Sequence, residues 1–505
     1  MSLKPFKIPG ILFIAGSLLP LSLAPFSLWP LAIISLLPLC IYLQHQTAKN
    51  SIKHSIKQAI KNATVFGFGL YLSGASWVYI SMYEHGDVSM AFAIVGTMLF
   101  CLFMALIFAL PFGLAAFLPQ TSVSWVLGFP ALWVFSEWFR SWIFTGFPWL
   151  YVGYSHTDTW LSGWAPLGGV FLLSYLTALN SAILAQLLQR RFSASVLVGS
   201  AVIAISFIGG YFFQTINWTQ PVNTQLSVAM VQPNVDQKDK WAVVQRNRIL
   251  RGLLSQTEPH WGTDIIIWPE GAIPALFSQA EEFLEDLDQR AKQNKTALIT
   301  GIPTDNNPAR HYYNSMLALG EGQGQYNKTR LVPFGEYVPF QSLIRGLNNF
   351  FDLPMSSFSL GAKYQTSIIA KQQPVATAIC YEIAYPDLVA KNVRDTNLLL
   401  TVSNDAWFGD SIAPQQHMQM ARMRAMENAK PLMRGTNNGI TALVDQRGKI
   451  YQQLSQFDKG VLTGYITPRT GSTPFSVLCS WPTISFSLFS LVILITFRLR
   501  KGNQR

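Results

Sequence analysis

The chain has 505 residues, of which 50% are hydrophobic and only 12% are charged, whereas soluble domains are usually about a quarter charged. Its formal net charge of +11 invites a nucleic-acid-binding function, but most of the excess of positive charge comes from short segments that flank apolar runs, which is a membrane-topology pattern. Composition therefore argues against an ordinary soluble protein, and we expect no nucleic-acid partner.

About eight apolar runs are long enough, or nearly so, to cross the hydrocarbon core of a bilayer, which takes about 20 residues. The first run is interpreted as a span rather than a cleaved signal peptide, because a second run follows almost at once with no small-residue cleavage pattern. The predicted spans are 9–26, 28–43, 64–83, 89–117, 122–139, 165–188, 194–213 and 478–497.

Basic residues between these spans predict the topology and the division into domains. The lysine-rich loop 44–63 and the basic C-terminus fall on one side of the membrane, and Lys and Arg mark the cytoplasmic side. Seven spans in residues 1–213 then place the polar segment 214–477 outside, in a periplasm-like space. Residues 478–505 return the chain to the cytoplasm as a last span and a basic tail.

The polar segment alternates short apolar strands with amphipathic helices, which is typical of a layered α/β domain. No repeat and no Gly-rich phosphate loop interrupts it. The predicted strands are 225–231, 264–268, 297–301, 313–319, 375–380, 398–402 and 440–444. The predicted helices are 241–255, 280–293 and 414–429.

Three reactive side chains occur at strand ends or in a loop of this segment. Glu270 follows one predicted strand, Cys380 ends another, and Lys328 lies in the irregular run 326–336. Strand ends are where ligands bind in α/β sheets. A carboxylate with a raised pKa can deprotonate a thiol, and an ammonium with the backbone N–H of Tyr381 can stabilise an oxyanion. On residue type and spacing alone, a solvated Glu and Lys and a buried Cys are the simpler explanation of the trio.

Cysteine usage gives no sign of a disulfide or a metal site. Of Cys40, Cys101, Cys380 and Cys479, only Cys380 lies in the polar segment, so that segment cannot form a disulfide from its own residues. No cysteine pair or histidine cluster has zinc-ligand spacing. We expect neither a metal nor a cofactor.

Three sequence blocks carry a family resemblance. Trp268-Pro269-Glu270, Lys328 within residues 327–336 (NKTRLVPFGE), and Cys380-Tyr381-Glu382 resemble the catalytic blocks of the nitrilase superfamily. The resemblance implies a Glu–Lys–Cys triad on an α-β-β-α sandwich. The expected fold is thus a polytopic α-helical membrane bundle joined to an α/β nitrilase-like domain.

Three further blocks narrow the resemblance to one family. Residues 145–150 (TGFPWL), 403–409 (SNDAWFG) and 436–440 (TNNGI), together with the spans on both sides of the domain, are similar to the apolipoprotein N-acyltransferases of Gram-negative-type bacteria. The resemblance covers essentially the whole chain and shows no departure at a triad position.

The resemblance implies a ping-pong acyl transfer. The donor would be a membrane phospholipid, with phosphatidylethanolamine expected, and the acceptor the N-terminal amine of a diacylglyceryl-cysteine in an apolipoprotein. Cys380 would be the nucleophile that carries the thioester, Glu270 the general base and acid, and Lys328 the oxyanion stabiliser. The enzyme would be a monomer of the bacterial inner membrane with its catalytic domain on the periplasmic side. Further positions that match supporting residues of the family are Glu336, Tyr381, Glu382 and Trp241.

Three other features allow both a plain and a functional interpretation. The apolar segment Phe340–Leu360 is either packed core or a mobile lid that admits acyl chains. His417 is more simply a hydrogen-bonded structural histidine than a base. Glu137 and Arg140 are costly in lipid and should face water or protein.

Two rival functions stay open. A membrane-anchored amidase acting on a small soluble molecule would use the same triad with water as acceptor, although one anchor would then suffice. A transporter or binding module would need polar groups or broken helices at mid-membrane, and the predicted spans carry almost no charge.

Overall fold

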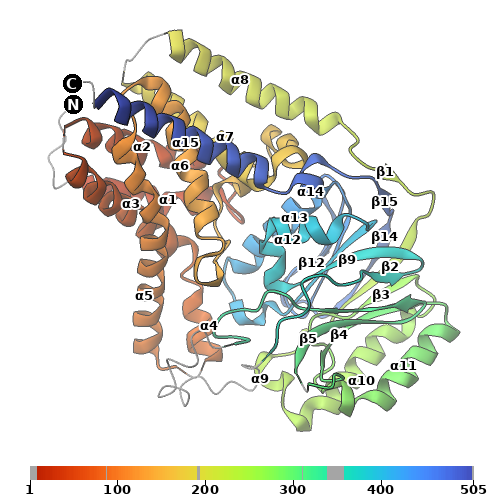
Figure 1. The fold of residues 1–505 in the computed structure, drawn as a ribbon. Helices are drawn as coiled ribbons and strands as arrows, with labels where there is room; N and C mark the ends of the chain where they lie inside the picture. Colours follow the sequence, from red (N-terminus) through yellow and green to blue (C-terminus); the bar gives the residue numbers. More distant parts are fainter. Residues whose placement is uncertain are drawn as a thin grey trace. The chain divides into compact units, whose positions relative to one another are not determined.

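The computed structural model separates into two units. The helical unit comprises Met1–Tyr79, Ser89–Ile216 and Leu478–Arg505, and the sheet unit comprises Ile80–Val88 and Asn217–Val477. Figure 1 shows helices alone in the first and two β-sheets with flanking helices in the second. The structure describes residues 8–49, 51–86, 88–189, 194–309, 311–337 and 358–502.

Within the described residues of the helical unit, four helices are long and apolar enough to cross a membrane, and one bent pair would make a fifth. Several long helices therefore confirm a polytopic bundle, while the number eight stays a prediction. The four are Met90–Phe117, Trp160–Leu188, Leu197–Thr215 and Trp481–Arg500. The helices are α1 (Ile8–Leu18), α2 (Pro30–Lys49), α3 (Ile52–Gly74), α5 (Met90–Ala109), α6 (Ser122–Phe139), α7 (Ala165–Leu188), α8 (Ala194–Thr215) and α15 (Trp481–Gly502). A further helix, α4 (Val78–His85), begins in this unit and belongs mostly to the sheet unit.

The structure corrects two boundaries of the predicted spans. The expected loop 44–63 is mostly helical, because α2 runs to Lys49 and Ser51 caps α3 by accepting from the backbone N–H of His54. The expected span 64–83 is broken, with α4 bent by 51° from α3. The break follows Gly74, where an added Cβ would lie 2.7 Å from a methyl carbon of Leu150.

Arg140 holds residues 145–150 of the helical unit, one of the blocks singled out in the sequence, in place. The side chains of Glu137 and Arg140 are 0% and 1% exposed, so both face protein, as one of the two expected alternatives had it. The Arg140 guanidinium donates to the backbone oxygens of Phe147 (3.2 Å), Trp149 and Leu150 (3.1 Å). Residues 145–150 are therefore shaped by one buried cation.

The sheet unit has two main sheets, ordered β13-β12-β11-β10-β9-β8-β6 and β14-β2-β3-β4-β5-β7. The strands are β1 (Gln220–Pro221), β2 (Leu226–Gln232), β3 (Ile265–Ile267), β4 (Ala297–Thr304), β5 (Tyr313–Gly320), β6 (Gly322–Gln323), β7 (Gln325–Asn327), β8 (Ile368–Ala370), β9 (Gln373–Ile379), β10 (Leu398–Ser403), β11 (Leu432–Thr436), β12 (Thr441–Val444), β13 (Ile450–Leu454), β14 (Gly460–Ile466) and β15 (Arg469–Thr470). The helices are α9 (Gln237–Lys240), α10 (Arg246–Thr257), α11 (Glu281–Gln293), α12 (Pro386–Val393), α13 (Ala413–Asn428) and α14 (Pro474–Leu478).

Three apolar clusters build the layers of this unit. The central cluster joins side chains of both sheets, including Ile267 and Leu400. A second packs the six-stranded sheet against α10 and α11, through residues such as Leu253 and Leu287. A third packs the seven-stranded sheet against α12 and α13. The result is the predicted α-β-β-α sandwich, with α10 and α11 on one outer face (Figure 1).

The central strands of both sheets are parallel. β2, β3 and β4 run in one direction, as do β9, β10 and β11. Their carboxyl ends carry the residues singled out in the sequence, because Glu270 follows β3 and Cys380 follows β9 directly. The predicted helix 241–255 is wrong at its start, since α10 begins only at Arg246 and residues 241–245 form a turn.

Candidate active site

The carboxylate of Glu270 stands on a tightly packed turn after β3. Trp268, fully buried, donates its Nε1–H to the Thr257 hydroxyl at 2.9 Å and fixes the strand end. β4 passes so close that a Cβ at Gly301 would lie 2.5 Å from the backbone oxygen of Pro269. The turn is thus held on both sides, and the Glu270 residue is only 8% exposed.

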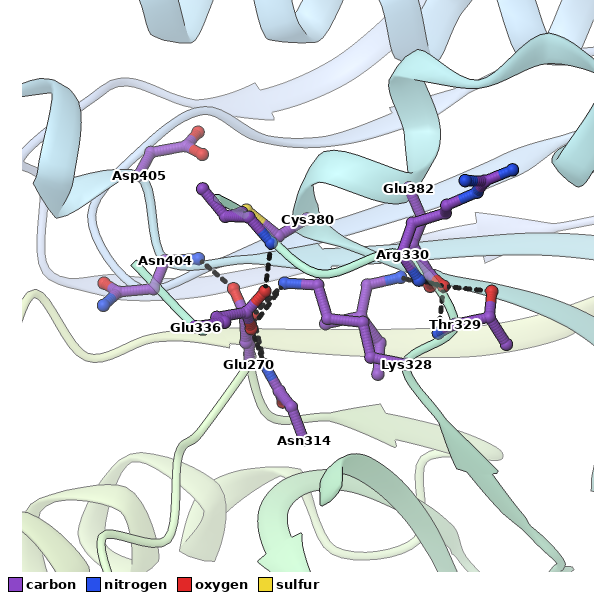
Figure 2. Close-up of polar contacts among 12 residues, drawn as sticks. Glu270, Asn314, Lys328, Thr329, Arg330, Glu336, Cys380, Glu382, Asn404 and Asp405 are labelled. Atoms are coloured by element: carbon purple, nitrogen blue, oxygen red, sulfur yellow. Dashed lines mark hydrogen bonds and ion pairs between the residues drawn. The ribbon is translucent and has the colours of Figure 1, made fainter. Parts of the chain in front are cut away.

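Four polar groups surround this carboxylate (Figure 2). The Lys328 ammonium lies 3.2 Å from Glu270 Oε1 and 2.8 Å from Glu336 Oε1. The Asn314 amide bridges the same two oxygens, at 2.8 Å each. The backbone N–H of Asn404 donates to Glu270 Oε2 at 2.9 Å. The structure therefore brings the predicted Glu270, Lys328 and Glu336 into one hydrogen-bonded cluster.

Charge pairing decides the protonation of this cluster. Burial opposes ionisation of Glu270, but the charges of Lys328 and Lys240 and the Asn314 hydrogen bond together hold its pKa below the usual range. Burial likewise disfavours the Lys328 ammonium, and the charges of Glu270 and Glu336 outweigh it and raise its pKa well above the ordinary value. Both groups are therefore ionised at neutral pH.

Cys380 follows β9 and begins the short 3₁₀ turn Cys380–Ala384. Its φ of +51° places the residue in the left-handed region, which costs a non-glycine residue about 1 kcal/mol. The residue is partly exposed, and Figure 2 shows it beside the carboxylates of Glu270 and Glu336. Burial, followed by the charge of Glu270, raises the pKa of the thiol well above its ordinary value, although Lys328 opposes the shift.

The protonation states differ from the expected ones in one respect. The sequence argument called for a carboxylate with a raised pKa, whereas the pKa of Glu270 is lowered because two lysines face it. The resting pair is consequently a neutral thiol and an ionised carboxylate. Proton transfer to Glu270 must accompany the attack of sulfur, rather than precede it.

Glu382 ties the Cys380 turn to the segment that carries Lys328. Its Oε1 accepts from the Thr329 backbone N–H at 2.6 Å, the Thr329 hydroxyl at 2.7 Å and the Arg330 N–H at 3.2 Å, and its Oε2 accepts from the Ile379 N–H at 2.8 Å. The Tyr326 hydroxyl contacts both oxygens at 3.1 Å. Burial raises the pKa of Glu382, and these N–H donors oppose the shift.

Tyr381 and Trp241 adjoin the cluster through neighbouring residues, Tyr381 next to Cys380 in the chain and Trp241 beside Gly271. Tyr381 is 8% exposed and its ring meets that of Tyr385 edge-on at 5.3 Å. Trp241 follows α9, and one of its ring carbons lies 3.7 Å from where a Cβ of Gly271 would stand, next to Glu270. The structure places both predicted residues at the cluster and leaves their roles as predictions.

Sequence reasoning missed Lys240, whose Nζ donates to the backbone oxygen of Glu270 at 2.9 Å. It is 5% exposed, whereas its neighbour Lys238 is exposed. A lysine in the run Gln237-Lys238-Asp239-Lys240 has the sequence signature of a solvated surface turn. In the sequence, only the adjoining Trp241, which matches a supporting residue of the family, indicated that this turn lies at the site.

His417 is a buried, hydrogen-bonded histidine behind the nucleophile. Its Nε2 lies 3.1 Å from the backbone oxygen of Cys380, and because that oxygen can only accept, Nε2 carries the proton. Its Nδ1 then accepts from Arg434 Nη2 at 3.1 Å and also lies 3.1 Å from Asp405 Oδ1, and Arg434 Nη2 donates to Asp405 Oδ2 at 2.9 Å. Burial and the charge of Arg434 lower the pKa of His417 and keep it neutral, although Asp405 opposes them.

Across the part of the chain that the structure describes, no group of three or more His, Cys, Asp or Glu residues could hold a metal ion. Most of the predicted lid, residues 340–357, lies outside the described residues. Phe358, at its end, is described, and its backbone N–H donates to the backbone oxygen of Glu336 at 3.1 Å.

Comparison with known proteins finds two family models along the chain. The apolipoprotein N-acyltransferase N-terminal domain matches residues 15–183, and the carbon-nitrogen hydrolase domain matches residues 227–475. A protein of Azotobacter vinelandii named apolipoprotein N-acyltransferase is 42% identical over 488 residues, covering 94% of this chain and 92% of the relative. The protein of that name in Pseudomonas aeruginosa PAO1 is 41% identical over 500 residues, covering 97% and 96%. Among solved structures, Saccharomyces cerevisiae Nit3 is 19% identical with a TM-score of 0.37, covering 50% of this chain and 93% of its own.

Proposed function

The chain belongs to the apolipoprotein N-acyltransferase family, and we propose that it moves a fatty acyl chain from a membrane phospholipid to the N-terminal amine of an apolipoprotein's diacylglyceryl-cysteine. The observation that carries the chemistry is a partly exposed thiol at a strand end, beside the buried Glu270–Lys328–Glu336 cluster. The apolar helices of the same chain supply the membrane setting that a lipid donor requires.

The first step forms a thioester. Cys380 Sγ attacks the ester carbonyl of the phospholipid while its proton passes to Glu270, and the Lys328 ammonium stabilises the oxyanion that develops. The carbon–oxygen bond to glycerol then breaks, and Glu270 returns the proton to the departing lysophospholipid hydroxyl. Burial of the ion pair strengthens these electrostatic effects, because little water screens them.

The second step transfers the acyl chain to the acceptor. The α-amine of the diacylglyceryl-cysteine attacks the thioester carbonyl and gives its proton to Glu270. The carbon–sulfur bond breaks, and the sulfur recovers a proton from Glu270, so the enzyme is regenerated. One cluster thus serves both half-reactions, which supports ping-pong kinetics.

The finer assignments belong to the same proposal. Phosphatidylethanolamine is the proposed donor, and the protein is proposed to be a monomer in the bacterial inner membrane. Residues 1–213 and 478–505 would be its membrane part, with 214–477 as a catalytic domain on the periplasmic side. The distribution of basic residues between the apolar runs supports this orientation.

The test is the intact mass of the purified protein after mixing with phosphatidylethanolamine and no acceptor. We expect the wild type to gain one acyl chain that hydroxylamine removes, and Cys380→Ala to gain none. Cys479→Ala is the matched control, because Cys479 is a buried thiol that should leave the adduct unchanged. A folded wild type that forms no adduct, but releases ammonia from small amides, would replace the proposal with the amidase alternative.

A further inference from the structure

We propose that Lys240 is a second functional lysine of this site, a positioning residue that holds the turn carrying Glu270 and places a positive charge beside Glu270 and Cys380. The inference rests on the proposed roles of those two residues. Lys240 lies outside the Glu–Lys–Cys triad. Its proposed role is to hold Glu270 in position and to keep its carboxylate ionised.

The geometry comes from a short helix that ends at the site. α9 (Gln237–Lys240) is capped by the Asp236 side chain, which accepts from the Lys238 N–H at 2.8 Å. Lys240, its last residue, is 5% exposed and sends its ammonium to the Glu270 backbone oxygen at 2.9 Å. The ammonium lies 5.9 Å from the centre of the Trp241 ring, within cation–π range.

Gly271 makes the close approach of this ammonium possible. Its φ of +54° is a conformation that favours glycine, and a Cβ added there would lie 3.3 Å from Lys240 Nζ. Trp241 occupies the other side of the same space, at 3.7 Å. The Glu270–Gly271 turn is therefore shaped around the lysine, and not merely adjacent to it.

A purely structural role does not account for a charged side chain at this position. Among the described residues, the hydrogen bond of the ammonium to the Glu270 carbonyl could be made by a neutral donor, without the cost of burying a charge. Burial lowers the pKa of Lys240 to about 8, although the charges of Glu270 and Cys380 oppose the shift. A buried charge beside the general base is better explained by its effect on the ionisation of Glu270 and Cys380.

That effect has a definite direction. The positive charge of Lys240 lowers the pKa of Glu270, together with Lys328, and so keeps the base ionised. A Cys380 thiolate would interact favourably with the same charge, because the charge of Cys380 raises the pKa of Lys240. Since the pKa of Lys240 is about 8, the charge is present at neutral pH and is lost as the pH rises through that value.

The experiment follows alkylation of Cys380 by iodoacetamide between pH 6 and 10, in detergent. The thiolate displaces iodide, so the rate reports the thiolate fraction and needs no lipid. At pH 7 we expect Lys240→Met to react about tenfold more slowly than wild type, because losing the positive charge raises the pKa of the thiol further and lowers its thiolate fraction. Lys240→Arg should match wild type at pH 7 and exceed it above pH 8, because arginine keeps its charge. Lys238→Met, exposed on the same helix, is the control and should match wild type throughout.

Formation of the lipid thioester provides the second readout. We expect the wild-type rate to fall as the pH passes 8, and Lys240→Arg to move this fall to higher pH. Equal loss of alkylation at every pH in Lys240→Met, without rescue by arginine, would show a structural role alone and overturn the inference. If the variants do not fold, a wild-type thioester rate that keeps rising to pH 10 would overturn it equally. Normal alkylation behaviour without any lipid adduct would instead refute the proposed function and leave the role of Lys240 standing.

Discussion

Each unit of the chain buries a carboxylate beside a basic side chain, and the two pairs have different partners. In the helical unit, Glu137 accepts from Trp133 Nε1 at 2.9 Å and the Val152 N–H at 2.8 Å, while Arg140 donates to backbone oxygens. In the sheet unit, Glu270 and Lys328 contact each other at 3.2 Å, with further side chains around them. The first pair is committed to shaping the backbone, and the second lies beside a partly exposed thiol.

The difference shows why burial of charge is not by itself a sign of catalysis. A buried ion pair costs desolvation energy in either unit, and removing one partner is costly in both. Only where the charges face a reactive, accessible group can that cost be offset by chemistry. The comparison therefore predicts that equivalent mutations in the two pairs affect different properties.

The largest effect is expected for Glu270→Gln. Loss of the general base should slow thioester formation by about 10³-fold, within the range of 10²–10⁴ typical of acid–base catalysis. The rate is measured as acyl adduct per folded molecule after mixing with phospholipid. In wild type, the low pKa of Glu270 should keep the base ionised as the pH falls, so the rate should drop only below about pH 5.

The control for that prediction is Glu137→Gln, the isosteric change in the other pair. It should leave the adduct rate of folded molecules within about twofold of wild type, since Glu137 contacts no residue of the cluster among its recorded partners. If Glu137→Gln slowed the chemistry as much as Glu270→Gln, the contrast between the two pairs would be wrong.

Arg140→Met should mainly lower stability. Three backbone oxygens lose a charged donor and Glu137 loses its counter-charge, which for a buried pair costs about 3–5 kcal/mol in the free energy of unfolding. The predicted loss of stability is measured as a lower thermal unfolding midpoint in detergent. Arg251→Met, at an exposed position, is the control. An unchanged midpoint together with lost acyl transfer would indicate that Arg140 acts in the chemistry.

Sequence patterns predicted the strand ends of this site better than its electrostatics. The strands before Glu270 and Cys380 were found because each is a short apolar run followed by a polar residue, a local signal. Lys240 was missed because its burial depends on a long-range approach to Gly271. The lowered pKa of Glu270 could not be predicted, since it requires two lysines from distant segments to lie beside one glutamate.

The dependence on long-range contacts also explains which strands and helix boundaries the sequence did not predict. The parallel strands β2, β3, β4, β9 and β10 were predicted within a few residues, whereas β11, β13 and β14 were missed. β13 is partly exposed along its length, so its sequence carries no apolar run, and its place comes from pairing with β12. At the break between α3 and α4, Gly74 lies against Leu150, a contact distant in sequence that no local pattern predicts.

Glu382→Gln should have an intermediate effect, which sharpens the comparison within the sheet unit. A glutamine has one acceptor oxygen, so at least one of the donors on Thr329, Arg330 and Ile379 loses its partner, and the amide N–H groups would oppose them. We expect thioester formation to slow about 100-fold, because Lys328 and Cys380 lose their common anchor. Glu285→Gln, exposed on α11, should change nothing. A normal rate in Glu382→Gln would mean that this carboxylate is not what aligns the two segments.

The smallest expected effect is that of His417→Ala. This change tests whether a neutral buried group next to the nucleophile affects the rate of thioester formation, as the charged Glu270 and Glu382 are expected to do. The imidazole Nε2–H holds the backbone oxygen of a residue in left-handed conformation. Losing one hydrogen bond to a buried oxygen costs about 1–1.5 kcal/mol, so we expect the thioester rate to fall about tenfold. His417→Gln, whose amide can donate to the same oxygen, should recover most of the lost rate, while Asp405 and Arg434 still pair at 2.9 Å.

If the alanine and glutamine variants were equally slow, the histidine would act through its ring packing rather than through the hydrogen bond. The effect should appear in the rate of acylation, with the affinity for phospholipid unchanged, because the buried His417 acts on the backbone oxygen of the nucleophile.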